Sequence, residues 1–319
     1  MKLAYITSSS YSGSTLLSFV LNSNPSIATI SEFDIMDSIK FDKDYMCSCG
    51  SKLRECVFFL SLKKNINDEG MGFELDEMDL MFYVSNNERI NRYLTQKIPF
   101  FNSTIIESIR DKILNHVSGY RKRIDEVYHR NDIFMKNVIK LQGGSVFLDA
   151  NKNPYRLKYL SSKYETSAIY LYKNGIAGAY SFFKASKTLD ANPITFEDAC
   201  TRWFIEQITI NRCLNNMKSV KKIDVPYSGF CEDTVGSVRS ICELLNIEYS
   251  SLDNFQASEH HIIGNVMRTS GIDEIKERLD WKDNLLEKDI STYRKTYDKY
   301  INKLKKENAN IVEHLWYEE

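Results

Sequence analysis

A run of small and hydroxyl-bearing residues near the amino terminus has the composition of an anion-binding loop. Residues 8–15 contain five serines, one threonine and a single glycine, Gly13. The apolar run before this segment predicts a strand, and the apolar spacing after Ser14 predicts a helix. A helix N-terminus presents free N–H groups and a partial positive charge, which favour phosphate or sulfate. An ordinary capped helix after a turn fits the same pattern. The candidate anion ligands are Tyr11, Ser12, Gly13, Ser14 and Thr15.

This loop differs from the phosphate-binding loop of ATPases and kinases. That motif requires G-x-x-x-x-G-K-[ST]. The segment here has one glycine and no lysine after it. A P-loop kinase is therefore the less favoured alternative.

The order of the predicted elements indicates an α/β protein. Apolar runs predict strands at 3–6, 27–30, 146–148, 167–172 and 220–225, and helical spacing predicts helices at 14–22, 153–163, 175–186, 196–217 and 234–246. Strands that alternate with helices predict a three-layer arrangement, a parallel β-sheet with helices on both faces. We expect one domain over residues 1–319, with a helix-rich insert at about 34–141 on the substrate side.

Composition excludes several classes of protein and of partner. The net charge is −1, so no broad basic field exists to bind nucleic acid. No run of about 18 apolar residues predicts a transmembrane helix, and the first seven residues turn polar too early for a signal peptide. The seven cysteines, an odd number, fit reduced thiols. We therefore expect a cytoplasmic protein.

Four segments occur in an order that resembles a known enzyme family. They are residues 11–17, 148–154, 169–181 and 260–268. Together they resemble the sulfotransferases that use 3′-phosphoadenosine 5′-phosphosulfate (PAPS), and their motifs are most similar to those of bacterial and tyrosylprotein sulfotransferases. The resemblance implies a P-loop-like sulfotransferase fold. It also implies sulfuryl transfer to an acceptor hydroxyl on a carbohydrate, lipid, small molecule or peptide.

The resemblance also implies where PAPS binds. Residues 11–15 correspond to the family's 5′-phosphosulfate loop, and Lys173 with Ser181 corresponds to its 3′-phosphate segment. Gly264, Asn265 and Arg268 match a looser C-terminal cofactor loop. Tyr227 can stack on the adenine or pack in the core.

This chain departs from the family pattern at basic positions. The family has a basic residue where this chain has Tyr11, and arginines where it has Lys173 and Ile176. Lysine keeps the charge but loses the bidentate fork of arginine. A nucleotide-binding homologue that has lost transferase activity is therefore an alternative.

Two charged residues at predicted strand ends are candidates for catalysis. Glu32 ends the second strand and faces the loop, so it is the candidate general base. Lys152 follows the third strand, and it can supply the positive charge that Tyr11 lacks. The alternatives are a surface carboxylate and a solvated lysine.

Three cysteines, Cys47, Cys49 and Cys56, lie close together in the insert. Zinc sites usually space two cysteines as C-x₂₋₄-C and add a second pair elsewhere. Here the first gap is one residue and no histidine is nearby in the sequence. We therefore expect no metal.

Overall fold

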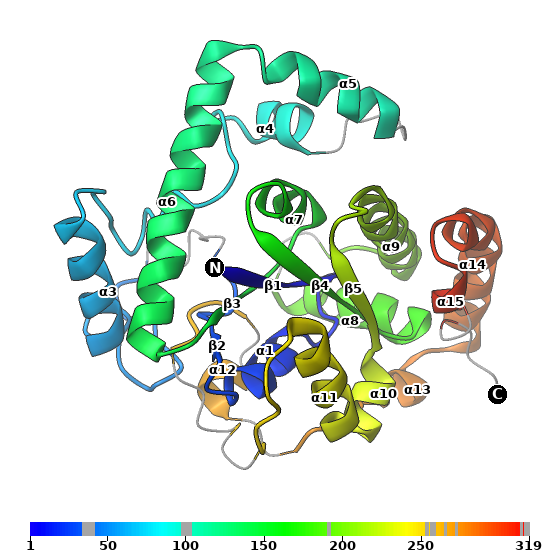
Figure 1. Ribbon diagram of the computed structural model, residues 1–319. Coiled ribbons are helices and arrows are strands. Elements are labelled where there is room, and N and C mark those ends of the chain that lie inside the picture. Colours follow the sequence, from blue (N-terminus) through cyan, green and yellow to red (C-terminus); the bar gives the residue numbers. More distant parts are fainter. Residues whose placement is uncertain are drawn as a thin grey trace.

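A five-stranded, all-parallel sheet forms the centre of the molecule (Figure 1), with strand order β2-β3-β1-β4-β5. The computed structural model describes residues 1–33, 42–96, 104–189, 193–252, 255, 260–264, 267–271, 274–312 and 315. The strands are β1 (Lys2–Ser8), β2 (Ile27–Ala28), β3 (Val146–Lys152), β4 (Glu165–Tyr172) and β5 (Lys221–Pro226).

Both faces of the sheet are buried. In β1, Leu3 and Tyr5 belong to one core and Ala4 and Ile6 to the other. Successive side chains of a strand point to opposite faces, so a strand buried on both sides reads as a continuous apolar run. This arrangement confirms the predicted three-layer α/β fold.

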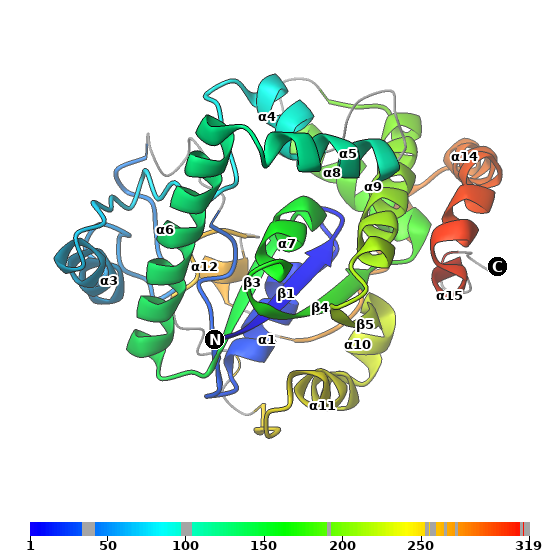
Figure 2. The same cartoon turned by 45° about the horizontal axis from the view of Figure 1, so that its top comes forward.

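Helices form the two outer layers (Figures 1 and 2). One face is covered by α1 (Ser14–Asn22), α10 (Tyr227–Glu232) and α11 (Thr234–Leu245). The other is covered by α7 (Pro154–Ser161), α8 (Gly175–Leu189) and α9 (Phe196–Asn216). Beyond α9 lie α14 (Glu287–Glu307) and α15 (Ala309–Val312), and the short helices α12 (Met267–Ser270) and α13 (Asp280–Asn284) precede them in the chain.

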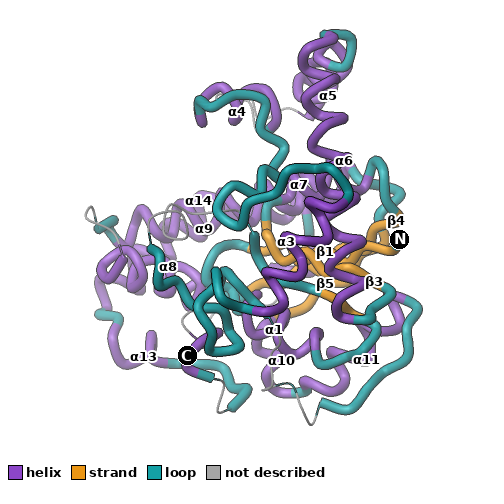
Figure 3. The backbone as a smooth tube through the Cα atoms, turned by 90° about the vertical axis from the view of Figure 1, so that its left-hand side faces the viewer, coloured by secondary structure: helices purple, strands orange, loops and turns teal. Residues whose placement is uncertain are grey.

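The segment between β2 and β3 contains four described helices. They are α3 (Val57–Asp68), α4 (Glu88–Thr95), α5 (Thr104–Leu114) and α6 (Ser118–Gln142). Helix α6 packs against β2 and β3, while α4 and α5 project beyond the sheet (Figure 3). Among the described helices, none has both the length and the apolar character needed to cross a bilayer.

A buried ion pair joins this segment to the sheet. Arg156 donates from Nε to Asp149 Oδ2 at 2.8 Å, and both side chains are almost fully buried. Its Nη1 donates to the carbonyl of Leu80 at 2.7 Å and its Nη2 to Asn131 Oδ1 at 2.6 Å. One guanidinium therefore connects β3, the loop after α3 and helix α6. Such a charge is tolerated in the interior because its donors are satisfied.

We predict that Arg156→Met lowers the free energy of unfolding by about 3–5 kcal/mol, because it leaves the Asp149 carboxylate buried without its cation. Urea denaturation measures the loss. The control is Arg92→Met, which removes an exposed pair with Glu88 and should cost no more than about 0.5 kcal/mol. A loss of that small size for Arg156→Met would contradict the assigned role.

Candidate functional site

The carboxyl ends of the three central strands meet at one edge of the sheet. The register pairs Thr7 of β1 with Lys152 of β3 and with Tyr170 of β4. The loop after β1, the end of β3 and Lys173 after β4 therefore lie at the same edge. Ligands of open α/β folds bind at this edge.

The loop after β1 is held in place from α9. Ser9 Oγ lies 2.6 Å from Ser12 Oγ, and Gln207 Nε2 donates to Ser9 Oγ at 3.0 Å. Gly13 precedes α1 with φ of 93°, a left-handed conformation that favours glycine. Because Gly13 has no side chain, it cannot cap the first N–H groups of α1. These groups therefore receive no hydrogen bond from the side chain of the N-cap residue.

Four residues proposed from the sequence, each from a different element, are neighbours in the structure. Lys173 Nζ lies 3.5 Å from Ser181 Oγ and 4.8 Å from the centre of the Tyr227 ring. The Cδ2–Cε2 edge of this ring approaches Gly13 so closely that an added Cβ would lie 2.2 Å from Cε2. The anion loop and the lysine of the lysine–serine pair therefore both lie next to one tyrosine ring.

Burial changes the ionisation of Lys173. It lowers the pKa of the ammonium to about 8, although the carboxylates of Glu277 and Asp280 oppose the shift. A cation that has lost its hydration is stabilised by an incoming anion, because the anion replaces the missing solvent. Lys173 therefore has the character of an anion ligand.

Glu32 and Lys152 form a partly buried ion pair. Lys152 Nζ lies 2.8 Å from Glu32 Oε1. Lys152 is the last residue of β3, which extends four residues beyond the strand end predicted at residue 148. Its carbonyl accepts a hydrogen bond from Thr7 Oγ1 at 2.8 Å. The side chain of Asn151 accepts a hydrogen bond from the Phe33 N–H at 3.0 Å. The residue after Glu32 and the residue before Lys152 are thus joined by a hydrogen bond.

Backbone strain is concentrated at the same edge. Tyr11, Ser31 and Lys152 have φ of 61°, 68° and 64°, and they are three of the five described non-glycine residues with positive φ. This conformation is unfavourable for side chains with a Cβ and persists where surrounding contacts enforce it. Strained residues cluster at functional sites, which agrees with the position of these three.

The remaining proposed ligands occupy different surroundings. Gly264 lies beside Thr15, since an added Cβ would be 2.8 Å from Thr15 Oγ1. Arg268 donates to the Met46 carbonyl and lies 4.7 Å from the centre of the Tyr45 ring, so in this structure it contacts the start of the insert. Its role with a nucleotide stays a prediction, and Asn265 lies outside the described residues.

Sequence reasoning missed two polar residues of α9. Gln207 holds the loop, and its Oε1 accepts a hydrogen bond from Tyr170. Burial raises the pKa of Glu206, although Arg202 and a hydrogen bond to the Ser10 backbone oppose the shift. The available signal was a glutamine one helical turn after Trp203, which is fully buried.

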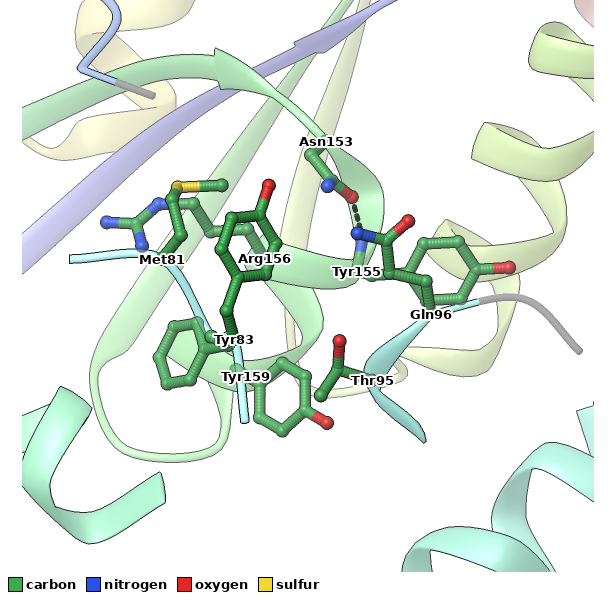
Figure 4. Close-up of a pocket in the computed structure, with 9 residues that line it drawn as sticks. Met81, Tyr83, Thr95, Gln96, Asn153, Tyr155, Arg156 and Tyr159 are labelled. Carbon is green, nitrogen blue, oxygen red and sulfur yellow. Dashed lines mark hydrogen bonds between the residues drawn. The ribbon is translucent and has the colours of Figure 1, made fainter. Parts of the chain in front are cut away.

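A small pocket lies between the insert and α7 (Figure 4). Met81, Tyr83, Thr95 and Gln96 line it from the insert. From the sheet side it is lined by Asn153, whose Oδ1 accepts from the N–H of Tyr155 at 2.9 Å, and by further residues of α7. Asn153 directly follows Lys152, so the pocket adjoins the strand end that carries the ion pair.

The sequence matches no protein-family model, and no curated protein matches it. Among solved structures, the sulfotransferase domain from the Synechococcus PCC 7002 olefin synthase aligns with a TM-score of 0.50 at 15% identity. The alignment covers 92% of this chain and 94% of that one. The chain has the sulfotransferase fold.

Two further sulfotransferase structures align over most of the chain. The sulfotransferase domain from the curacin biosynthetic pathway is 14% identical and aligns with a TM-score of 0.47. The alignment covers 93% of this chain and 96% of that domain. Sulfotransferase STF1 from Mycobacterium tuberculosis H37Rv is 12% identical and aligns with a TM-score of 0.45. That alignment covers 92% of this chain and 76% of STF1.

The contact between Gly13 and Tyr227 in this sulfotransferase fold can be tested by substitution. We predict that Gly13→Ala lowers stability by about 1–3 kcal/mol beyond the cost of positive φ, because the new methyl group overlaps the ring. Gly70→Ala is the control, since Gly70 also has positive φ (+80°) but has open space around it. Chemical denaturation compares the two variants. Equal losses would contradict the close contact.

Proposed function

We propose that the protein transfers a sulfuryl group from PAPS to a hydroxyl group of an acceptor. The observation that carries this proposal is the cluster of Lys173, Ser181 and Tyr227 against Gly13. A partly buried cation and the Gly13 loop both lie next to one tyrosine ring, and a hydroxyl lies beside the cation. PAPS carries anionic groups at both ends of its ribose, and this cluster offers two matching sites.

The proposed donor site divides the two anionic groups between two elements. The 5′-phosphosulfate binds at the N-terminus of α1, where backbone N–H groups and the hydroxyls of Ser12, Ser14 and Thr15 are donors. The 3′-phosphate binds at Lys173 and Ser181. This second site distinguishes PAPS from ATP and from other nucleotides without a 3′-phosphate.

In the proposed reaction, the acceptor oxygen forms a bond to sulfur while the bond from sulfur to the 5′-phosphate oxygen breaks. Glu32 takes the acceptor proton as general base. Lys152 stabilises the negative charge that the transferred group and the leaving phosphate share. 3′-Phosphoadenosine 5′-phosphate and the sulfated acceptor are the products.

The ion pair between Glu32 and Lys152 fits these roles. The two charges lie 2.8 Å apart, and we propose that each exchanges its partner when substrates bind. Lys152 then turns to the sulfuryl group, and Glu32 accepts a hydrogen bond from the acceptor hydroxyl. This assignment explains how the loop can function with Tyr11 at a position where the family has a basic residue.

The insert is the proposed acceptor side. Its residues form one wall of the pocket in Figure 4, and α7, which begins two residues after Lys152, forms the other. Residues from the insert therefore lie next to the strand end where we place the chemistry. We propose that they select the carbohydrate, lipid, small-molecule or peptide that carries the acceptor hydroxyl.

Lys173 makes the donor site testable through its pKa. The protonated amine binds the 3′-phosphate, and its pKa in the free protein is about 8. Affinity for 3′-phosphoadenosine 5′-phosphate should therefore be steady just below pH 8. Above pH 8 it should fall by up to about tenfold per pH unit, because binding then requires uptake of a proton. Titration calorimetry from pH 7 to 9.5 measures this dependence.

Two controls isolate the lysine. Lys173→Arg keeps its charge across this range, so its affinity should show little dependence on pH. Adenosine 5′-monophosphate lacks the 3′-phosphate and should bind wild type with little change above pH 8. A fall of the same size in the arginine variant, or for both nucleotides, would refute the assignment.

A further inference from the structure

A cluster of three cysteines and one histidine lies outside the proposed donor site. The loop before α3 carries Cys47 and Cys49, and Cys56 is the N-cap residue of that helix. His260 follows Cys56 by 204 residues in the chain. Their sulfur atoms and one ring nitrogen of the histidine all lie within 4.8 Å of one another. The described structure thus supplies the histidine that the sequence alone did not bring near the cysteines.

The spacing of these atoms matches a tetrahedral metal site. With Zn–S bonds of about 2.3 Å and Zn–N bonds of about 2.0–2.1 Å, the edges of a tetrahedron are about 3.8 Å between sulfurs and about 3.6 Å from sulfur to nitrogen. The Sγ atoms of Cys49 and Cys56 are 3.6 Å apart. His260 Nδ1 lies 3.7 Å from Cys47 Sγ and 3.4 Å from Cys56 Sγ.

The surrounding backbone suits sulfur atoms that carry negative charge. Backbone N–H groups of Cys49, Ser51 and Phe59 hydrogen-bond the sulfurs of Cys47, Cys49 and Cys56, respectively. Cys56 is also the N-cap residue of the 12-residue helix α3, where the helix dipole favours an anion. Hydrogen bonds of this kind orient the ligands of metal sites.

The histidine is held in a fixed orientation. Its ring stacks on Phe58 with the centroids 4.4 Å apart and the planes 6° apart. The next residue, His261, donates its N–H to Ser48 Oγ at 2.8 Å, and its carbonyl accepts the N–H of Ser48 at 3.2 Å. Backbone pairing and ring stacking thus hold His260 against the cysteine loop.

We propose that Cys47, Cys49, Cys56 and His260 bind one zinc ion in a closed, structural site. Three thiolates and an imidazole in a tetrahedral arrangement favour Zn²⁺ over magnesium or calcium, which prefer oxygen ligands. Four protein ligands leave no open position for a catalytic water. This proposal replaces our sequence-based expectation of no metal, and it does not depend on the proposed function.

The ion connects the insert to the candidate site. Residues that follow His260 reach the site directly, because Ile263 pairs with Ser31 and Glu32 and Gly264 lies beside Thr15. Zinc would therefore fix the segment 260–264 to the loop 47–56. Its removal should lower the melting temperature and expose the 260–264 segment to protease.

The full-length protein, expressed with zinc and dialysed, provides the first test. Mass spectrometry of metals should find about one zinc per chain in the wild type. Cys49→Ser, which changes an exposed ligand, and His260→Ala should lose most of it. The matched controls Cys242→Ala and His129→Ala change the same residue types elsewhere and should keep wild-type zinc.

Cobalt provides a measurement that does not depend on variants that fold poorly. Wild-type protein reconstituted with Co²⁺ should show the visible bands of tetrahedral cobalt and near-ultraviolet charge transfer from sulfur. Cys49→His should keep the metal with weaker charge transfer, since one sulfur is replaced by nitrogen. The proposal is overturned if the wild type takes up neither zinc nor cobalt, if it binds iron instead of zinc, or if it contains a Cys49–Cys56 disulfide instead of a metal. It is also overturned if Cys49→Ser and His260→Ala both keep the zinc content of the wild type.

Discussion

The buried carboxylate of Asp149 is the interaction on which the rest of the site depends. One oxygen accepts from Arg156 Nε, and the other accepts from the N–H and the side-chain amide of Asn151. Asn151 in turn accepts the N–H of Phe33. The Asp149 carboxylate thus positions the end of β3 and, through Asn151, the backbone of Phe33. Through Arg156 it also connects β3 to the insert. Lys152 and Glu32 face one another because their neighbours are bonded through this carboxylate.

The proposed donor side of the site depends on the energetic cost of partly burying a different charge. Burial lowers the pKa of Lys173, and this residue lies beside a hydroxyl and an aromatic ring. Buried ions of this kind are kept where a ligand of opposite charge compensates them. The strained backbone of Tyr11, Ser31 and Lys152 adds to that cost at the same edge. The features that lower the stability of the folded state are therefore found where we propose that ligands bind.

The fold and the proximity of the candidate donor ligands were predictable because they depend on local patterns. Buried parallel strands appear as short apolar runs, and residues at their carboxyl ends must share an edge. This geometry explains why Lys152 and Glu32, placed from separate segments, form a pair, and why Lys173 lies near the loop. Their chemical roles stay predictions. Short helices such as α10 and α13 were not predicted, because six and five residues are too few to show a helical period.

Contacts between distant parts of the chain were not predictable in the same way. His260 meets three cysteines that precede it by more than 200 residues, and no periodicity links such segments. Gln207 is a buried polar residue of α9, and its contact with Ser9, 198 residues earlier in the chain, shows that it holds the loop. The sequence placed the basic residue Arg268 in a segment that resembles a cofactor loop. Its contacts with Tyr45 and Met46 could not be predicted, because they depend on how the insert packs.

Transfer of radiolabelled sulfate from PAPS to a panel of carbohydrate, lipid, phenol and peptide hydroxyls is the assay that decides whether the protein is an active sulfotransferase. We expect transfer by the wild type to at least one class of acceptor. Glu32→Gln and Lys152→Ala should each reduce the rate by about 10²-fold or more while 3′-phosphoadenosine 5′-phosphate still binds. Tight binding of this nucleotide with no transfer to any acceptor class would contradict the account and would indicate a nucleotide-binding homologue without transferase activity.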